Sequence, residues 1–194
     1  MSEAANALTL QRARAGSREA LGEVLQGHRA LIERLARQVV GSGDDCEDVV
    51  QETVIAVATG LPRFRGDCTV KTWIAGITVR IALRHAQRRR RDQGLRAPMD
   101  LAHGVAGSPG RSGDPSAALQ AGEFRQRLQA AVDALPPDRR TVFALRHVED
   151  LSLMETAAAL GIPLGTVKSR LHHAREALRE MMAPYLADEG GERR

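Results

Sequence analysis

Residues 151–182 read LSLMETAAALGIPLGTVKSRLHHAREALREMM, and this stretch decides the fold of the C-terminal half. Ser152 is a typical helix N-cap, and the apolar residues after it predict a short helix that ends at the turn Gly161–Pro163. A longer helix follows, with apolar residues at helical spacing on one stripe: Val167, Leu171, Ala174, Leu178 and Met181. A short helix, a glycine-containing turn and a second helix predict a helix-turn-helix motif.

The second helix of this motif carries a polar stripe opposite its apolar one. The stripe contains Lys168, His172, Arg175 and Arg179, flanked by Ser169, Arg170 and His173. The second helix of a helix-turn-helix normally lies in the major groove of DNA, where such side chains bind phosphates and base edges. A basic face that only contacts solvent is the alternative interpretation. The motif and the cluster of donors together favour DNA binding.

The rest of the chain also carries helix signals. Pro136–Pro137 breaks one helix, and Pro137 or Asp138 begins the next. Nearer the N-terminus we expect four helices: one capped by Ser17, a second that Gly41 stops, a third with Asp44 as its N-cap, and a long fourth capped by Thr69. Apolar residues at helical spacing, with aromatics at only 3% of the chain, favour helix packing over a sheet.

Residues 92–115 differ in character, being rich in Gly, Pro and Ser without an apolar period. Such a segment predicts a flexible linker that spans about 25–30 Å on average. The sequence therefore predicts an all-α protein of two small helical domains that the linker holds apart. The expected N-terminal domain covers residues 8–91, and the expected C-terminal helix-turn-helix domain covers residues 116–187.

A second basic surface is expected in the N-terminal domain. Arg80, Arg84 and Arg88 recur every four residues along the long helix, a spacing that allows one face to follow a phosphate backbone. The loop before that helix contains Phe64 and Arg65, and single-strand binders combine such cations with base-stacking rings. Trp73 lies on the apolar stripe, so we expect it to pack in the core.

Composition and motifs exclude several classes of protein. The 194 residues carry a net charge of +4, and Lys71 and Lys168 are the only lysines, so arginine supplies nearly all the positive charge. No stretch is apolar enough to span a membrane, which predicts a cytoplasmic protein without membrane insertion. We find no catalytic, phosphate-loop or zinc motif and therefore expect no enzyme, cofactor or metal.

Two features leave alternatives open. The acidic run at residues 44–48 is typical of a helix N-terminus, where the dipole favours carboxylates, and lacks the glycine bend of a calcium loop. Cys46 and Cys68 are too few for a disulfide scaffold. They are expected to be buried free thiols, with a redox switch as the alternative.

Long motifs in both halves resemble those of extracytoplasmic-function (ECF) sigma factors. In the C-terminal half they are residues 135–152, LPPDRRTVFALRHVEDLS, and 158–171, AALGIPLGTVKSRL. In the N-terminal half they are AGSREA at 15–20, EDVVQET at 47–53, RFRGD at 63–67 and TWI at 72–74. The resemblance covers about residues 8–183 in the family's order.

The resemblance implies a factor that binds RNA polymerase core and directs promoter-specific initiation without catalysis. It implies that Asp48, Gln51 and Glu52 dock on the clamp helices of the largest subunit, and that the flap and an anti-sigma factor are further partners. The minus-10 element would be opened and read by Phe64, Arg65, Arg80, Arg84 and Arg88. The minus-35 element would be bound by Lys168, Ser169, Arg170, His172, His173 and Arg175.

The chain departs from the family pattern at a few positions. His173 stands where the family usually has an arginine that can read guanine, and Arg80 replaces a frequent asparagine. The usual minus-35 sequence is therefore not expected. A stand-alone helix-turn-helix regulator that binds operators as a dimer is the alternative function, although the N-terminal half offers no apolar dimer seam.

Overall fold

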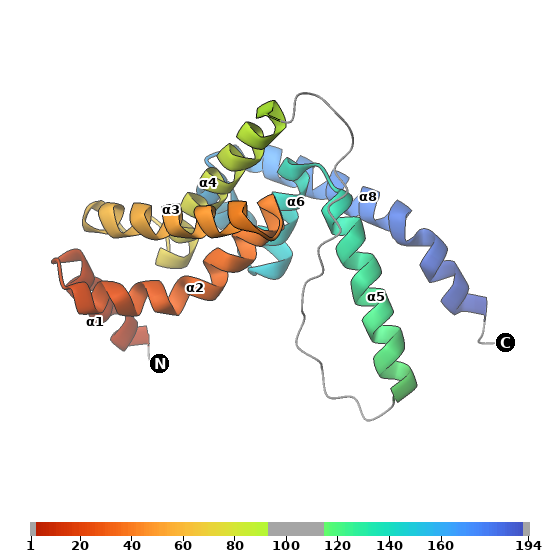
Figure 1. The fold of residues 1–194 in the computed structure, drawn as a ribbon, viewed down its shortest axis with the longest axis horizontal. Coiled ribbons are helices and arrows are strands. Elements are labelled where there is room, and N and C mark those ends of the chain that lie inside the picture. Colours follow the sequence, from red (N-terminus) through yellow and green to blue (C-terminus); the bar gives the residue numbers. More distant parts are fainter. Residues whose placement is uncertain (1–2, 93–114, 192–194) are drawn as a thin grey trace.

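A computed structural model of the protein describes residues 3–92 and 115–191, and every regular element in these two ranges is a helix (Figure 1). The all-α prediction is therefore confirmed. The predicted linker, residues 92–115, falls almost entirely outside the described residues. The elements in chain order are α1 (Glu3–Arg14), α2 (Arg18–Val40), α3 (Asp44–Gly60), the 3₁₀ turn η1 (Leu61–Arg63), α4 (Val70–Asp92), α5 (Pro115–Ala134), α6 (Pro137–Phe143), the π-helical turn η2 (Ala144–Val148), α7 (Leu153–Leu160) and α8 (Leu164–Gly191).

Helix α2 is one continuous element where two helices were predicted. It begins as expected, because the Ser17 hydroxyl accepts a hydrogen bond from the Ala20 N–H at 3.3 Å. It ends as expected at Gly41, whose φ of 86° suits glycine. Between these ends the sequence contains no proline, and a glycine such as Gly27 costs a helix only about 1 kcal/mol. Burial of one apolar side of α2 outweighs that cost.

The N-cap of α3 is Gly43, so the prediction of Asp44 was wrong. Gly43 adopts a φ of 114° that favours glycine, and Asp44 lies in the first helical turn, where its charge favours the helix dipole. The N-cap predicted for α4 is confirmed, since the Thr69 hydroxyl accepts a bond from the Thr72 N–H at 3.1 Å. Pro137 begins α6, also as expected.

Each half has apolar clusters of its own. One cluster lies wholly among α2, α3 and α4. A second joins α5 to α8, which lie side by side, and a third joins α6 and α7 to the start of α8 (Figure 1). Both halves therefore bury apolar surface without help from the other.

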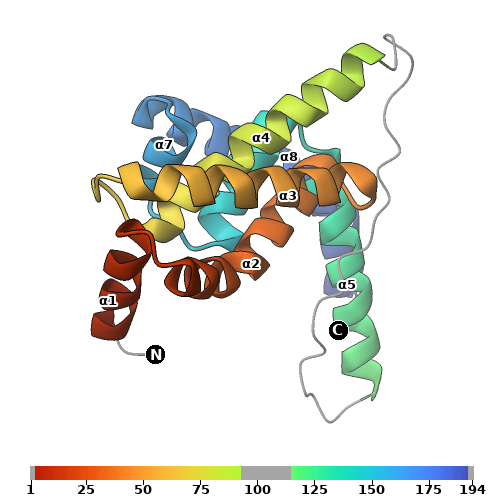
Figure 2. The ribbon, with the colours of Figure 1, turned by 60° about the vertical axis from the view of Figure 1, so that its left-hand side comes forward.

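The two halves nevertheless pack against each other, which corrects the expectation that they are held apart. Helix α7 lies on α4 (Figure 2). Both α6 and η2 contact α2. The largest apolar cluster is mostly N-terminal but includes Leu145, Leu151 and Ala159 from the C-terminal half. Linker length sets the greatest separation of two tethered domains, whereas complementary surfaces decide whether they dock. Residue periodicity does not reveal such a match.

Candidate nucleic-acid interface

Local hydrogen bonds build the helix-turn-helix. The Ser152 hydroxyl accepts a bond from the Glu155 N–H at 3.1 Å, and the Glu155 carboxylate accepts one from the Ser152 N–H at 2.9 Å. This reciprocal capping box starts α7. Gly161 ends α7 in the left-handed conformation, with a φ of 65°, and α8 begins at Leu164. The predicted motif is confirmed.

The buried stripe of α8 differs from the predicted one at its end. The first four predicted members are buried, but Met181 is 40% exposed and Met182 is only 6% exposed. The contact with α5 continues at i+4 spacing from Ala174 through Leu178 to Met182, and it is extended by Tyr185. Successive residues of a helix point about 100° apart, so Met181 turns toward solvent.

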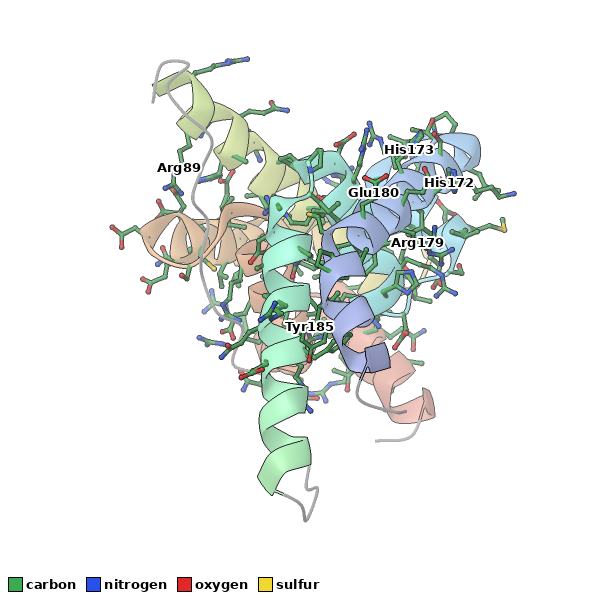
Figure 3. The ribbon with its side chains drawn as sticks, turned by 90° about the vertical axis from the view of Figure 1, so that its right-hand side faces the viewer. Arg89, His172, His173, Arg179, Glu180 and Tyr185 are labelled. Carbon is green, nitrogen blue, oxygen red and sulfur yellow. The ribbon has the colours of Figure 1, made fainter. Side chains whose placement is uncertain are left out.

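The opposite face of α8 presents most of the predicted DNA-binding side chains to solvent. Figure 3 labels His172, His173 and Arg179 along this helix. Lys168, Ser169, His172, His173 and Arg175 are all exposed. Hydrogen-bond donors at the start of a recognition helix can bind the base edges and the phosphates of a major groove.

Arg170 has a different environment from its neighbours. Its Nε lies 3.3 Å from a carboxylate oxygen of Asp138 on α6, and the side chain is about one-third exposed. This ion pair connects the recognition helix to the helix that precedes the motif. The guanidinium of Arg170 is therefore already engaged by a carboxylate of the protein.

Two residues that the sequence analysis did not single out shape this face. Glu176 lies 3.4 Å from His172 and 3.6 Å from His173, atom to atom, so a carboxylate stands among the donors. Arg175 lies 3.2 Å from Nε2 of His147. Burial, together with the nearby positive charge of Arg175, lowers the pKa of His147, which favours a neutral ring that can accept this bond. Spacings of three and four residues could have revealed Glu176, but nothing local indicates His147.

On α4, the predicted arginines Arg80, Arg84 and Arg88 are exposed. Arg84 also pairs with Glu52 of α3 at 3.1 Å. Further along, Arg89 pairs with Asp45 at 3.2 Å and points from α4 toward α3 (Figure 3). The basic face of α4 is thus anchored to the acidic side of α3 at two positions.

The loop before α4 contains two residues predicted to contact nucleic acid, and they differ in their exposure to solvent. Phe64 is only 6% exposed and packs against Trp73, with ring centroids 5.1 Å apart. Arg65 is exposed. Trp73 packs against the largest apolar cluster, as expected. In this arrangement Arg65 is available at the surface, and Phe64 is not.

The three residues expected to dock on polymerase are not equivalent. Asp48 and Gln51 are exposed. Glu52 instead binds Nε2 of His85 at 2.9 Å as well as Arg84, and the hydrogen bond from His85 is the main cause of its lowered pKa. Glu52 therefore joins α3 to α4.

Next to Gln51 lies an apolar groove between α2 and α3, with a volume of about 450 Å³. Ile55 lies on its rim and is 63% exposed. Large exposed apolar side chains beside a groove indicate a protein-contact surface. No prediction included this groove, although α3 carries apolar residues beyond those of its buried face, and these surplus residues could have indicated it. The apolar residues that line the groove are Leu25, Ile32, Val50, Val54 and Ile55.

The remaining expectations concern metal, thiols and membranes. Within residues 3–92 and 115–191, no group of three His, Cys, Asp or Glu is placed to hold a metal ion. Cys46 is buried and Cys68 half-buried, both are free thiols, and burial raises the pKa of each. A raised pKa reduces the reactive thiolate fraction and so disfavours a redox switch. The described helices include none with the length and apolar composition needed to cross a membrane.

Comparison with known families assigns both halves. Residues 24–92 match the family described as sigma-70 region 2, and residues 125–178 match the family described as sigma-70, region 4. These matches fall on the α2–α4 segment and on the segment that contains the helix-turn-helix.

Curated relatives and solved structures agree with these matches. The chain is 33% identical over 166 residues to ECF RNA polymerase sigma factor SigE of Mycolicibacterium smegmatis, covering 86% of this chain and 63% of that protein. It is 31% identical over 184 residues to the ECF RNA polymerase sigma-E factor of Escherichia coli, covering 91% of this chain and 94% of that one.

Two solved structures have a similar fold. One is the sigma factor RpoE in complex with the anti-sigma factor NepR from Bartonella quintana, with a TM-score of 0.65 and 23% identity, over 84% of this chain and 96% of that one. The other is CnrH in complex with the cytosolic domain of CnrY, with a TM-score of 0.62 and 22% identity, over 91% and 96%.

Proposed function

The chain belongs to the ECF family of RNA polymerase sigma factors, and from this membership we propose how its two halves divide the work of promoter recognition. Sigma factors are non-enzymatic initiation factors that direct RNA polymerase core to promoters. Residues 8–91 dock on core and read the minus-10 element, and residues 116–187 read the minus-35 element. The observation that carries this proposal is the exposed, donor-rich face of α8 on a capped helix-turn-helix.

For the minus-35 element, we propose direct reading by Lys168, Ser169, His172 and His173. Their exposed side chains lie on the first turns of α8, where a recognition helix meets base edges. Arg170 and Arg175 are proposed to contact phosphates, which position the helix. Because histidine lacks the bidentate fork of arginine, His173 should alter the preferred sequence.

For the minus-10 element, we propose that Arg80, Arg84 and Arg88 follow the phosphate backbone while Arg65 contacts the separated strand. Their spacing along one helix supports this role. Phe64 stays a predicted stacking residue, but its ring must first leave its contact with Trp73.

For polymerase docking, we propose that Asp48 and Gln51 act together with the apolar groove and Ile55. Glu52 supports them indirectly by fixing α3 against α4. A central apolar anchor surrounded by polar residues is a common arrangement in protein interfaces.

We further propose that the chain works in the cytoplasm, where RNA polymerase acts, and itself catalyses nothing. An anti-sigma factor is the proposed regulator. One structural neighbour supports this proposal, because it is a sigma factor in a co-crystal with the anti-sigma factor NepR.

The test is run-off transcription with purified cognate core polymerase and a promoter library. We expect promoter-specific transcripts only when the chain is present, and Ile55→Ser should weaken core binding at least about tenfold. Met154→Ser is the matched control, because Met154 is also exposed, at 74%, and lies on α7. Tight operator binding without core, and no transcript with it, would instead establish a stand-alone regulator.

A further inference from the structure

We propose that Glu176 is a positioning residue that decides which bases His173 selects in the minus-35 element. It holds the His173 ring so that the ring presents a hydrogen-bond acceptor to DNA when neutral and a donor when protonated. This inference rests on the proposed function and deepens it, because it assigns a base preference, and its dependence on pH, to one exposed side chain of α8.

One carboxylate oxygen serves two neighbouring rings. Oε2 of Glu176 lies 3.4 Å from Nε2 of His172 and 3.6 Å from Nδ1 of His173. The two rings lie near each other on α8, with centroids 5.5 Å apart (Figure 3). Spacings of three and four residues place Glu176 on the same helix face as both histidines. A carboxylate in this position favours an N–H on each nitrogen that faces it.

The two rings turn different nitrogens toward Glu176. His172 uses its outer nitrogen, Nε2, whereas His173 uses its inner nitrogen, Nδ1. A neutral imidazole has one N–H and one acceptor nitrogen, and the partner of one nitrogen sets the role of the other. An N–H at Nδ1 therefore leaves Nε2 of His173 as an acceptor. The His173 side chain is 51% exposed, so this outer edge is accessible to a base.

An acceptor in the major groove selects bases that carry an amino group. Cytosine N4 and adenine N6 donate there, whereas guanine presents the acceptors O6 and N7. Neutral His173 should therefore disfavour guanine, which is the opposite of the preference of arginine. Protonation places a proton from solvent on Nε2, and the imidazolium can then donate to guanine. An ordinary histidine titrates near pH 6.5, so this change falls close to neutral pH.

The carboxylate of Glu176 lies on a face proposed to meet DNA, where phosphates repel it. It could accept a hydrogen bond directly from cytosine N4. The positioning role is favoured because its Oε2 already lies at ion-pair distance from both rings. Within residues 3–92 and 115–191, Glu176 is the only ion-pair partner of His172 and of His173.

Other charged groups around α8 have partners of their own. Arg175 lies beside His147 of η2, and burial lowers the pKa of His147, which moves its titration below that of an ordinary histidine. The helices packed against α8 are α5, α6 and α7. Among their charged groups, Arg127 lies over the ring of Tyr185, Asp138 pairs with Arg170, Arg140 binds the carbonyl oxygens of Asp133 and Val39, and Glu155 caps α7 at Ser152.

Sequence selection with the polymerase holoenzyme at pH 8 and at pH 6 tests the proposal. The minus-35 element is randomised and the minus-10 element is kept constant. Fluorescence anisotropy then compares promoter fragments that differ by one base pair, so that effects of pH elsewhere on polymerase cancel in the ratio of the two affinities. At pH 8 the unmodified chain should prefer adenine or cytosine to guanine at one position. At pH 6 this preference should fall at least about threefold.

Two variants separate the roles of the carboxylate and the ring. Glu176→Ala should weaken the preference at pH 8 at least about threefold, because His173 can then present either nitrogen. Glu180→Ala is the matched control, since Glu180 is also an exposed glutamate of α8 and the change in helix propensity is the same. His173→Gln should remove the response to pH, because an amide donates and accepts at every pH. His28→Gln, on α2, should retain it.

Other results would overturn the proposal. An equal preference at pH 6 and pH 8 for the unmodified chain would refute reading by a titrating ring. An unchanged preference in Glu176→Ala would refute positioning. If Glu176→Ala loses its helical circular dichroism signal, Glu176→Gln replaces it, because an amide that can also donate no longer fixes the ring and should weaken the preference equally.

Two further outcomes identify what is wrong. A cytosine preference that survives His173→Gln but is lost in Glu176→Ala would mean that Glu176 itself reads the base, which refutes a role through His173. Failure of the unmodified holoenzyme to bind any promoter fragment at either pH would refute the proposed function instead.

Discussion

Arg34 and Glu149 are 115 positions apart in the sequence, yet the Arg34 guanidinium donates two hydrogen bonds of 2.8 Å to the Glu149 carboxylate. Arg34 is half exposed, whereas Glu149 is almost completely buried. The pair joins α2 to the segment between η2 and α7. A planar, bidentate contact of this kind requires both partners to be held in position.

This pair should be energetically coupled in the full-length chain. A double-mutant cycle with Arg34→Gln and Glu149→Gln should give a coupling free energy of unfolding of about 1 kcal/mol, since Arg34 remains half in water. Urea denaturation of the four proteins measures it. Arg29→Gln combined with Glu149→Gln is the control, because Arg29 pairs with Glu33 on its own helix. Equal coupling in both cycles would contradict the contact.

The bridge between α3 and α4 should depend on pH. The hydrogen bond from His85 lowers the pKa of Glu52 below its ordinary value of 4.5. A lowered carboxyl pKa contributes stability above pH 4.5 that is lost as the pH falls through the folded-state pKa. Glu52 is about 40% exposed, so the contribution should stay below about 1 kcal/mol.

Thermal unfolding between pH 7 and pH 3 measures that dependence. The Glu52→Gln variant should be less stable than the unmodified chain at pH 7, and the difference should shrink toward pH 3. Glu180→Gln provides the control, since Glu180 is exposed within α8 and is far along that helix from its first turn. A difference that is constant across this pH range would exclude the proposed ionised contact.

Arg175 should act on DNA through charge. It is exposed on α8, and we expect Arg175→Ala to weaken binding of the polymerase holoenzyme to all promoter sequences nearly equally. The slope of log affinity against log salt should decrease by about one phosphate contact. Arg12→Ala, on the distant helix α1, should leave the slope unchanged. If both variants retain the slope of the unmodified chain, Arg175 does not contact a phosphate.

His173 should influence which minus-35 sequence is chosen. The change His173→Arg introduces a fork that can bind guanine O6 and N7 together, worth about 1–3 kcal/mol of discrimination. Sequence selection with the holoenzyme should then return a new guanine preference at one position. His28→Arg, on α2, should return the original preference. Identical selected sequences for all three proteins would argue against direct reading at this position.

Much of the local structure was predictable because its causes are local. Ser17, Thr69 and Ser152 cap helices through bonds to N–H groups three residues away, and Gly41 and Gly161 end helices through backbone freedom. The donors on α8 were visible for the same reason, since helical periodicity fixes their common face. Helix α1 escaped prediction because its residues show little amphipathic pattern.

The candidate site was predictable in part. The exposure of Lys168, His172 and Arg65 follows from periodicity and loop composition. The burial of Phe64 does not, because it depends on where Trp73 of the next helix lies. In the same way, Glu52 was expected to face a partner protein, and the approach of α4 turned it toward His85.

By itself the sequence determined the helical class, the helix-turn-helix and the chemistry of its reading face, because hydrogen bonds and periodicity within a few residues specify them. Only the tertiary structure decided which of those residues meet across the chain. The docking of α7 on α4 depends on one missing Cβ at Gly76 and on the burial of Glu149 against Arg34. Such contacts arise from complementary shape and charge between distant segments, which no local pattern encodes.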